Sequence, residues 1–411
     1  MAHQFQKLSE VPELYPRQSV RGHCAGSPLG ALPTELIEQI ARELKRVDIC
    51  SLRLVCRTLL HHTSHSFGLV CLTTVRTHLS QRCLQKLEEL SRHEQFRHYV
   101  QTLHIVDYFR NDQADNDLGQ GFSWDRGPSG RLEFPNQAVR ILQDLLPKLE
   151  NCRSLHIHVN EWGWGTECLS YTDVLAIVLC IIAEASLPIT SLILESSRMR
   201  KPARLDLQTY QTPNFKRAWS QLQRLSLLHT EVNLQDLDWI VGLVSYASGL
   251  KSLSLVGRSP GSDPYLDQLS SSNELPRLEE LDLRCVHRIT FSALSRFLLR
   301  FSDSLRVLKL SECSILGPWE PIFRLLRDEF PFLNTASLYM LSEVGDIIWV
   351  EGHHLAPCPG VFENLSPSGD QYGGFKITHQ EKVSGELRPI GISYTGQEMS
   401  TALDMLIESF T

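Results

Sequence analysis

The chain lacks a strong excess of charge of either sign. Its 411 residues include 40 Lys and Arg and 47 Asp and Glu, so the formal net charge is −7, and the two signs are interspersed. Binding to the phosphates of a nucleic acid requires a concentrated basic surface. The composition therefore predicts no nucleic-acid partner.

Long apolar runs are missing as well. The longest, Val174 to Ala183, has ten residues, about half of the roughly 20 that a membrane-spanning helix needs. We expect it to be a buried helix, and no membrane partner is predicted.

The 11 cysteines show no C-x-x-C spacing, and the polar stretch from Met1 to Arg21 is unlike a signal peptide. Reduced thiols and a cytoplasmic or nuclear location follow most simply.

The sequence also lacks the motifs that usually mark enzymes. No G-x-S-x-G, P-loop or G-x-G-x-x-G segment follows a predicted strand. His61 and His65 share a helical face, and His156 and His158 share one side of a strand, but neither pair has further ligands at zinc-site spacing. A catalytic cysteine would need a neighbouring base, and the pattern shows none. We therefore predict no catalytic residue, no metal site and no cofactor, and a protein that is not an enzyme.

What the sequence does contain begins with two apolar helical stripes between residues 29 and 67. Pro33 stands in the first turn of the first helix, where its missing N–H is no loss. Asp48 is predicted to be the N-cap of the second helix. The first stripe consists of Leu32, Leu36, Ile37, Ile40, Ala41 and Leu44, and the second of Ile49, Leu52, Val55, Cys56, Leu59 and Leu60.

The order LP-x-E-L, a short charged break, and L-x-L-V-C-R resembles the F-box. The resemblance implies a three-helix module at residues 29–67 that docks on the Skp adaptor of a cullin-based ubiquitin ligase. The family often has an aromatic residue where this chain has Leu59, which implies a weaker adaptor contact there. The alternative is an ordinary amphipathic helix pair that closes off a larger fold. The adaptor contacts implied by the resemblance are Leu32, Pro33, Leu36, Ile40, Leu44, Leu52, Val55 and Cys56.

A second feature is a recurring L-x-x-L-x-L unit, in which a strand-like alternation gives way to a helical period. The first leucines of the four clearest units are 28, 28 and 27 residues apart. These units are Leu222/Leu225/Leu227, Leu250/Leu253/Leu255, Leu278/Leu281/Leu283 and Leu305/Leu308/Leu310, with looser ones at Leu333/Ala336/Leu338, Ile189/Leu192/Leu194, Cys152/Leu155/Ile157 and Val100/Leu103/Ile105.

A strand–helix unit of this length resembles the leucine-rich repeat, and its even spacing disfavours a doubly wound α/β domain. The predicted fold class is therefore α/β, with the N-terminal F-box followed by a leucine-rich-repeat solenoid at 68–344. The resemblance places its parallel strands on a concave face and its helices on a convex one. Residues 1–28 are predicted to be a disordered leader and 111–131 a mobile insertion, because both have little to bury. Residues 345–411 are predicted to form an irregular C-terminal cap, with a possible hairpin around Ser384-Gly385.

The side chains between the repeat leucines are expected to project from the concave face. Their mixed charges favour a polypeptide target, with Arg284 and Lys309 as central contacts brought close together and an exposed Asp282 nearby. Trp162 and Trp164, in a glycine-containing loop, are predicted to form a lateral contact. Two alternatives stay open: the charges satisfy one another across the strands, and the tryptophans pack over the 111–131 insertion.

Together the two resemblances imply a substrate-recognition subunit of a Skp–cullin–F-box ubiquitin ligase. The F-box would hold the Skp adaptor, and through it the cullin scaffold, while the repeats hold an unknown target protein. The alternatives are a repeat scaffold with no link to ubiquitin and an enzyme with an unrecognised site. A docking module must leave Leu32, Pro33, Ile40 or Val55 partly uncovered by its own chain, which separates it from a helical cap.

Overall fold

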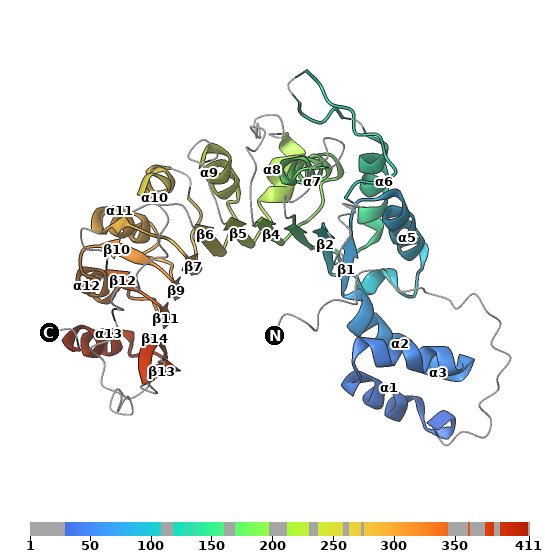
Figure 1. Ribbon diagram of the computed structural model, residues 1–411, viewed down its shortest axis with the longest axis horizontal. Helices are drawn as coiled ribbons and strands as arrows, with labels where there is room; N and C mark the ends of the chain where they lie inside the picture. Colours follow the sequence, from blue (N-terminus) through green and yellow to red (C-terminus); the bar gives the residue numbers. More distant parts are fainter. Residues whose placement is uncertain are drawn as a thin grey trace. The chain divides into compact units, whose positions relative to one another are not determined.

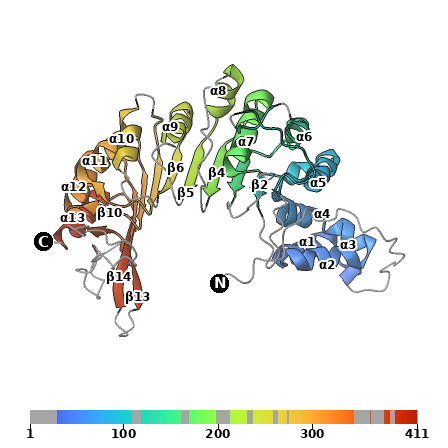
Figure 2. The ribbon, with the colours of Figure 1, turned by 45° about the horizontal axis from the view of Figure 1, so that its top comes forward.

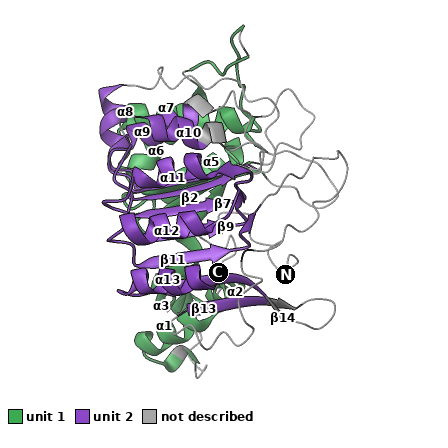
Figure 3. Cartoon of the chain, turned by 90° about the vertical axis from the view of Figure 1, so that its left-hand side faces the viewer, with its two compact units in different colours: residues 1–159, 163–189 green, residues 160–162, 190–411 purple. Residues whose placement is uncertain are grey.

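The structure, a computed structural model of the whole chain, divides into two compact units (Figure 3). Unit 1 comprises residues 1–159 and 163–189, and unit 2 comprises 160–162 and 190–411. The residues that the structure describes are 29–107, 118–128, 130–134, 136–159, 169–196, 212–229, 237–257, 263–272, 275–343, 361, 375–381 and 387–409. The predicted leader at 1–28 lies outside them.

Unit 1 begins with a helical module whose helices are shorter than the sequence indicates (Figure 1). The predicted cap Asp48 lies in the first turn of the second helix, and Lys45 is its N-cap. That helix does not continue to Leu60, because Cys56 has an extended backbone (φ −160°, ψ 165°) and separates two helices. Within 29–67 the elements are η1 (Leu29–Ala31), α1 (Thr34–Glu43), α2 (Arg46–Val55), α3 (Arg57–His62) and α4 (Ser64–Phe67).

The rest of unit 1 combines three parallel strands with helices. Its strands β1 (Thr74–Thr77), β2 (Thr102–Val106) and β3 (Ser154–His158) pair in parallel, with Leu103 opposite Leu155. The apolar run predicted to be a buried helix is the core of α7, and no helix among the described residues is long and apolar enough to cross a membrane. The remaining elements are η2 (Gly68–Leu72), α5 (Gln81–Arg92), η3 (Arg97–Tyr99), α6 (Gln137–Leu145), η4 (Leu146–Lys148) and α7 (Tyr171–Ala185).

The described part of the predicted mobile insertion 111–131 packs against other residues of unit 1, which corrects that prediction from Leu118 onward. Leu118 is buried, and the N–H of Gly119 donates to the carbonyl of His78 over 2.8 Å. The Arg126 guanidinium donates to both carboxylate oxygens of Asp173, over 3.0 and 2.7 Å. Composition alone missed this order because the partner that holds the segment lies far along the chain.

Unit 2 is built on parallel strands in which the recurring units lie side by side. Leu225, Leu253, Leu281, Leu308 and Ala336 are register partners from one strand to the next. The prediction that each unit forms a strand is therefore confirmed. In order across the sheet, the parallel strands are β4 (Ser191–Ser196), β5 (Arg224–His229), β6 (Ser252–Gly257), β7 (Glu280–Arg284), β9 (Val307–Ser311) and β11 (Thr335–Tyr339).

The helices of unit 2 follow the strands in alternation and lie on one face of its sheet (Figures 1 and 2). The repeat leucines are buried between the two layers. Burying one such side chain contributes about 1.5–3 kcal/mol, so these ladders form the core of the unit. The helices on this face are α8 (Pro213–Trp219), α9 (Leu237–Tyr246), α10 (Asp263–Ser271), α11 (Phe291–Leu299) and α12 (Glu320–Glu329).

Three turns of unit 2 repeat the same unusual backbone conformation. Cys285, Glu312 and Met340 each follow a strand of the sheet and have φ values of +54°, +55° and +49°. Positive φ is uncommon for residues other than glycine. Its recurrence at the same place indicates that the turn shape comes from the stacking of the units. Beyond the turns lie the short parallel strands β8 (Ile289–Thr290), β10 (Ser314–Leu316) and β12 (Ser342–Glu343).

The C-terminal segment is more regular than predicted. Strand β14 (Leu387–Thr395) pairs antiparallel with β11, and β13 (Phe375–Glu381) pairs antiparallel with β14. The strands flank the predicted hairpin turn at Ser384-Gly385, which itself lies outside the described residues. Helix α13 (Met399–Glu408) follows β14, and its Asp404 forms an ion pair with Arg327 of α12. For the described residues, the irregular cap is corrected to a hairpin and a helix, and strand β14 of the hairpin satisfies the hydrogen-bonding edge of β11.

Candidate functional site

The N-terminal helical module has a core of its own. Ile37, Cys56 and Leu59 form a buried cluster, and Leu32 and Leu52 pack against it while remaining partly exposed. Leu59 is only 2% exposed. The position where an aromatic residue was expected to contact an adaptor therefore lies inside the module, and so does the predicted contact Cys56.

Large apolar side chains on the first two helices face solvent instead. On α1, Leu36 and Ile40 are 46% and 41% exposed, and because they are four residues apart they form one ridge. On α2, Val47, Leu54 and Val55 are 57–59% exposed. Exposed apolar side chains that lie together on one helix, as Leu36 and Ile40 do, are typical of a site for a protein partner.

The placement of the predicted adaptor contacts divides them into groups. Pro33, Leu36, Ile40 and Val55 are exposed, as a docking residue must be. The other predicted contacts apart from Cys56, namely Leu32, Leu44 and Leu52, are half-buried. Sequence reasoning missed Val47 and Leu54. Their separation of seven residues, which places both on one side of a helix, was the available signal.

A buried arginine fixes the exposed ridges to the rest of the module. The guanidinium carbon of Arg53 lies 4.1 Å from the centre of the Phe67 ring, and the group donates a 3.0 Å hydrogen bond to the Leu60 carbonyl. The Glu38 carboxylate accepts a 3.0 Å hydrogen bond from the N–H of Ser66. Because α2 and α1 are both tied to α4, the apolar ridges are presented by a preorganised scaffold.

The predicted target contacts in unit 2 are already engaged in ion pairs. Arg284 pairs with Asp282 and Lys309 with Glu280, both with nitrogen–oxygen distances of 2.6 Å. Glu280 also accepts a 3.0 Å hydrogen bond from Ser252. The hydrogen bond from Lys309 holds the pKa of Glu280 below its usual range, although burial acts in the opposite direction.

The register of the strands places Lys309 opposite Asp282 and Arg284 opposite Ser311. The two cations are therefore diagonal neighbours on the same side of paired strands, while each forms its ion pair with a carboxylate. Asp282, expected to be exposed, is buried at 7%. The arrangement matches the alternative in which charges satisfy one another. Trp162 and Trp164 lie outside the described residues.

The structure brings a histidine to a cysteine that sequence reasoning left without a base. Cys83 lies in the first turn of α5, where its N–H donates to the Oγ of the N-cap Ser80. Burial raises the pKa of the Cys83 thiol, but hydrogen bonds from His78 and Ser80 outweigh it and lower that pKa to about 7. The sequence gives no sign of this pair. His78 lies before the helix and Cys83 within its first turn, and this spacing matches no catalytic motif.

We expect Cys83 to be alkylated faster than an ordinary buried thiol. At neutral pH about half of a thiol with this pKa is thiolate, the reactive form. Burial raises the pKa of Cys152 to about 12, which makes it the internal control. When folded protein is treated with iodoacetamide, site-resolved mass spectrometry should show Cys83 reacting at least about tenfold faster than Cys152. The substitution His78→Gln should slow the reaction of Cys83 and leave that of Cys152 unchanged. Equal rates at the two cysteines would contradict the assignment.

Comparison with known proteins identifies the N-terminal module. A family model described as the F-box domain matches residues 29–66. The match does not extend to the strand–helix units, and a search of curated proteins found no match to the chain. F-box domains typically bind Skp-type adaptors. The chain therefore contains an F-box domain, which suggests an adaptor role in Skp–cullin–F-box ligases.

Proposed function

We propose that the chain is a substrate-recognition subunit of a Skp–cullin–F-box ubiquitin ligase. The observation that carries the proposal is the exposed apolar surface on α1 and α2 of the F-box module. A helix pair that merely closed off the fold would turn Leu36, Ile40 and Val55 toward its own chain. Instead these three side chains are exposed, while Ile37 and Leu59 pack into the module's own core.

The Skp adaptor is the proposed occupant of this surface, and it would link the chain to a cullin scaffold. Fully burying an exposed Leu, Ile or Val contributes about 1.5–3 kcal/mol, so these half-exposed side chains each supply about half of that. The predicted contacts Leu32, Pro33, Leu44 and Leu52 would lie at the margin. Val47 and Leu54 are added to the proposed contacts because they are among the most exposed apolar residues of the module.

The strand–helix units are proposed to be leucine-rich repeats that hold the target protein. Three observations support this: equal positions pair from strand to strand, the helices of unit 2 lie on one face of its sheet, and the turns repeat. A doubly wound fold would carry helices on both faces. The face opposite the helices is the proposed target surface, with Arg284 and Lys309 as contacts. Trp162 and Trp164, which lie outside the described residues, stay proposed lateral contacts. Ion pairing of the two cations means that a target would have to compete with Asp282 and Glu280.

The proposed role needs no catalytic side chain. Holding a target near a ubiquitin-charged enzyme raises its effective concentration, and proximity alone accelerates transfer. The proposed location is the cytoplasm or the nucleus, where thiols such as the free Cys50, Cys71 and Cys83 stay reduced.

The double substitution Leu36→Ala with Ile40→Ala tests adaptor docking. We expect affinity for a purified Skp-type adaptor, measured by calorimetry, to fall at least about tenfold because two contacts are truncated on one ridge. The matched control is Leu316→Ala with Phe332→Ala, two apolar residues of unit 2 with similar exposure. This control should bind like wild type.

Two outcomes would overturn the proposal. One is a wild-type chain that does not bind the adaptor, which would favour a repeat scaffold unconnected to ubiquitin. The other is a double variant that is folded by circular dichroism and binds as tightly as wild type. If docking holds, wild type and the double variant should differ in affinity purification followed by mass spectrometry. The variant should lose the adaptor and the cullin together and should still retain the target proteins.

A further inference from the structure

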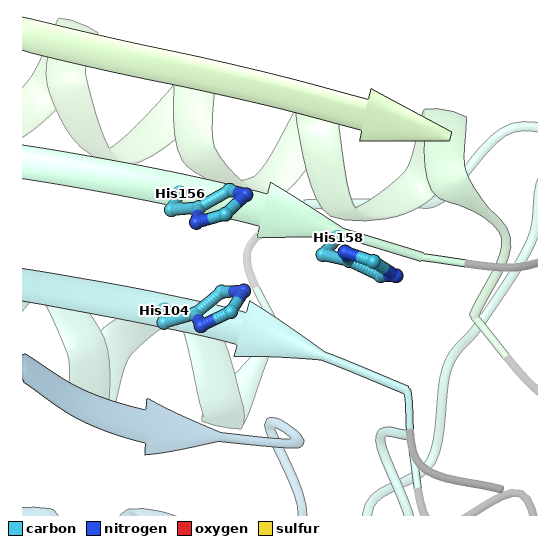
Figure 4. A group of neighbouring side chains, drawn as sticks. All are labelled: His104, His156 and His158. Carbon is cyan, nitrogen blue, oxygen red and sulfur yellow. The ribbon is translucent and has the colours of Figure 1, made fainter. Parts of the chain in front are cut away.

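Three histidines gather on one face of two neighbouring strands of unit 1 (Figure 4). His104 of β2 and His156 of β3 are register partners, and His158 lies two residues further along β3. Successive side chains of a strand point to opposite faces, so these three share the face away from the buried Leu103 and Leu155. Sequence analysis considered only the pair on β3, because His104 reaches them through strand pairing.

The imidazole rings approach closely enough for one ion to bridge them. The rings of His104 and His156 are stacked at 4.0 Å with an interplanar angle of 5°. The ring of His158 stands edge-on to them, with centroids 6.2 Å from His104 and 6.3 Å from His156. One nitrogen from each histidine lies within 4.8 Å of the other two, and all three residues are half-buried.

These distances are close to what a zinc ion requires. Tetrahedral zinc holds histidine nitrogens at 2.0–2.1 Å, which places the ligand atoms about 3.3 Å from one another. Ring rotations that bring each pair of nitrogens closer by about 1.5 Å or less would complete that geometry. The strand backbones, already spaced by the sheet at about 4.8 Å, need not move.

The surroundings bear on which ion would bind and how tightly. Imidazole nitrogen is a preferred donor for zinc, copper and nickel, but not for magnesium or calcium. Asp107 follows β2 and donates its backbone N–H to the His158 carbonyl over 3.3 Å, which places an acidic residue at this end of the site. On the other side, the register partner of His104 is Arg76, whose charge would weaken binding of a cation.

We propose that His104, His156 and His158 bind one zinc ion or a transition-metal ion of the same class. Three protein ligands leave the fourth tetrahedral position open, to be filled by water or by a donor from a bound polypeptide. The three ligands come from two neighbouring strands, so the ion would also cross-link β2 to β3. The site does not depend on the F-box docking surface.

Cobalt titration of the full chain, after removal of metals with a chelator, tests the proposal. Tetrahedral Co²⁺ bound by nitrogen and oxygen should give visible d–d bands without the thiolate charge-transfer band that a cysteine ligand would add. We expect one equivalent to bind and zinc to displace it. His156→Asn and His158→Asn should each weaken binding more than about 100-fold, because each removes a direct ligand.

The matched control is His98→Asn, an exposed histidine of the same unit outside the cluster, which should leave the spectrum unchanged. Should His156→Asn disturb folding, His158→Asn at the end of β3 gives the same comparison, and circular dichroism checks both. A wild-type chain without the nitrogen-type spectrum, or a folded His158→Asn variant with wild-type affinity, would overturn the proposal. Adaptor binding should be equal in all variants.

Discussion

Replacement of Leu281 by alanine is expected to lower the free energy of unfolding by about 2–5 kcal/mol. Leu281 is fully buried on β7, and its register partners Leu253 and Leu308 are also fully buried. Removing its side chain leaves a cavity in the middle of a ladder whose neighbours cannot collapse without breaking the strand pairing. Urea denaturation followed by circular dichroism measures the change.

The matched control makes the same chemical change on the solvent side of a helix. Leu299 of α11 is 41% exposed, and Leu299→Ala should cost well below the core value, at about 0.5 kcal/mol. Equal losses at Leu281 and Leu299 would show that Leu281 does not lie in the core of the unit. The comparison thus tests whether the leucine ladders are the core.

The second large effect is expected at the ion pair that holds residues 118–134. The Asp173 carboxylate is 5% exposed in the wild type, and in Arg126→Gln it loses its two hydrogen bonds from the guanidinium. Hydrogen bonds to charged groups contribute about 1.5–3 kcal/mol, and we expect a loss of that size. The hydroxyl and N–H of Ser170 still hydrogen-bond to Asp173, which keeps the helix cap of α7 and limits the damage.

Hydrogen exchange should show where the Arg126→Gln loss is located. Amides of the segment from Leu118, including the Gly119 N–H bonded to His78, should exchange faster than in wild type. Arg92→Gln is the control, since its pair with Glu88 is a surface i,i+4 pair worth less than about 0.5 kcal/mol. If the two variants lose the same stability, Arg126 does not order the segment.

The strands of unit 2 and the helices of the F-box module were largely predictable because their signals are local. A leucine at every second position specifies which side of a strand is buried, whatever lies beside it. The apolar stripe on the first helix likewise predicted its existence, but which of its residues are buried, as Ile37 is, and which stay exposed, as Leu36 and Ile40 are, came from the structure. Even the burial of α7 followed from ten consecutive apolar residues.

The positions where sequence reasoning erred depend on partners far away in the chain. Residues 118–131 have a composition typical of a mobile loop, yet Arg126 is ordered by Asp173. The break at Cys56 has no local proline or glycine to announce it, and it follows from the packing of Cys56 and Leu59 onto Ile37. A local pattern cannot indicate an energy gain that arises only when distant residues meet.

By itself, the sequence determined the periods: where strands and helices lie, and which of their sides are apolar. Tertiary structure alone decided which polar groups meet. Parallel pairing places His104 against His156, and it sets Lys309 opposite Asp282, where it forms its ion pair with Glu280. The reason is physical: burial depends on a side chain's own period along one element, whereas a site of several polar groups depends on the register between elements, which no single element encodes.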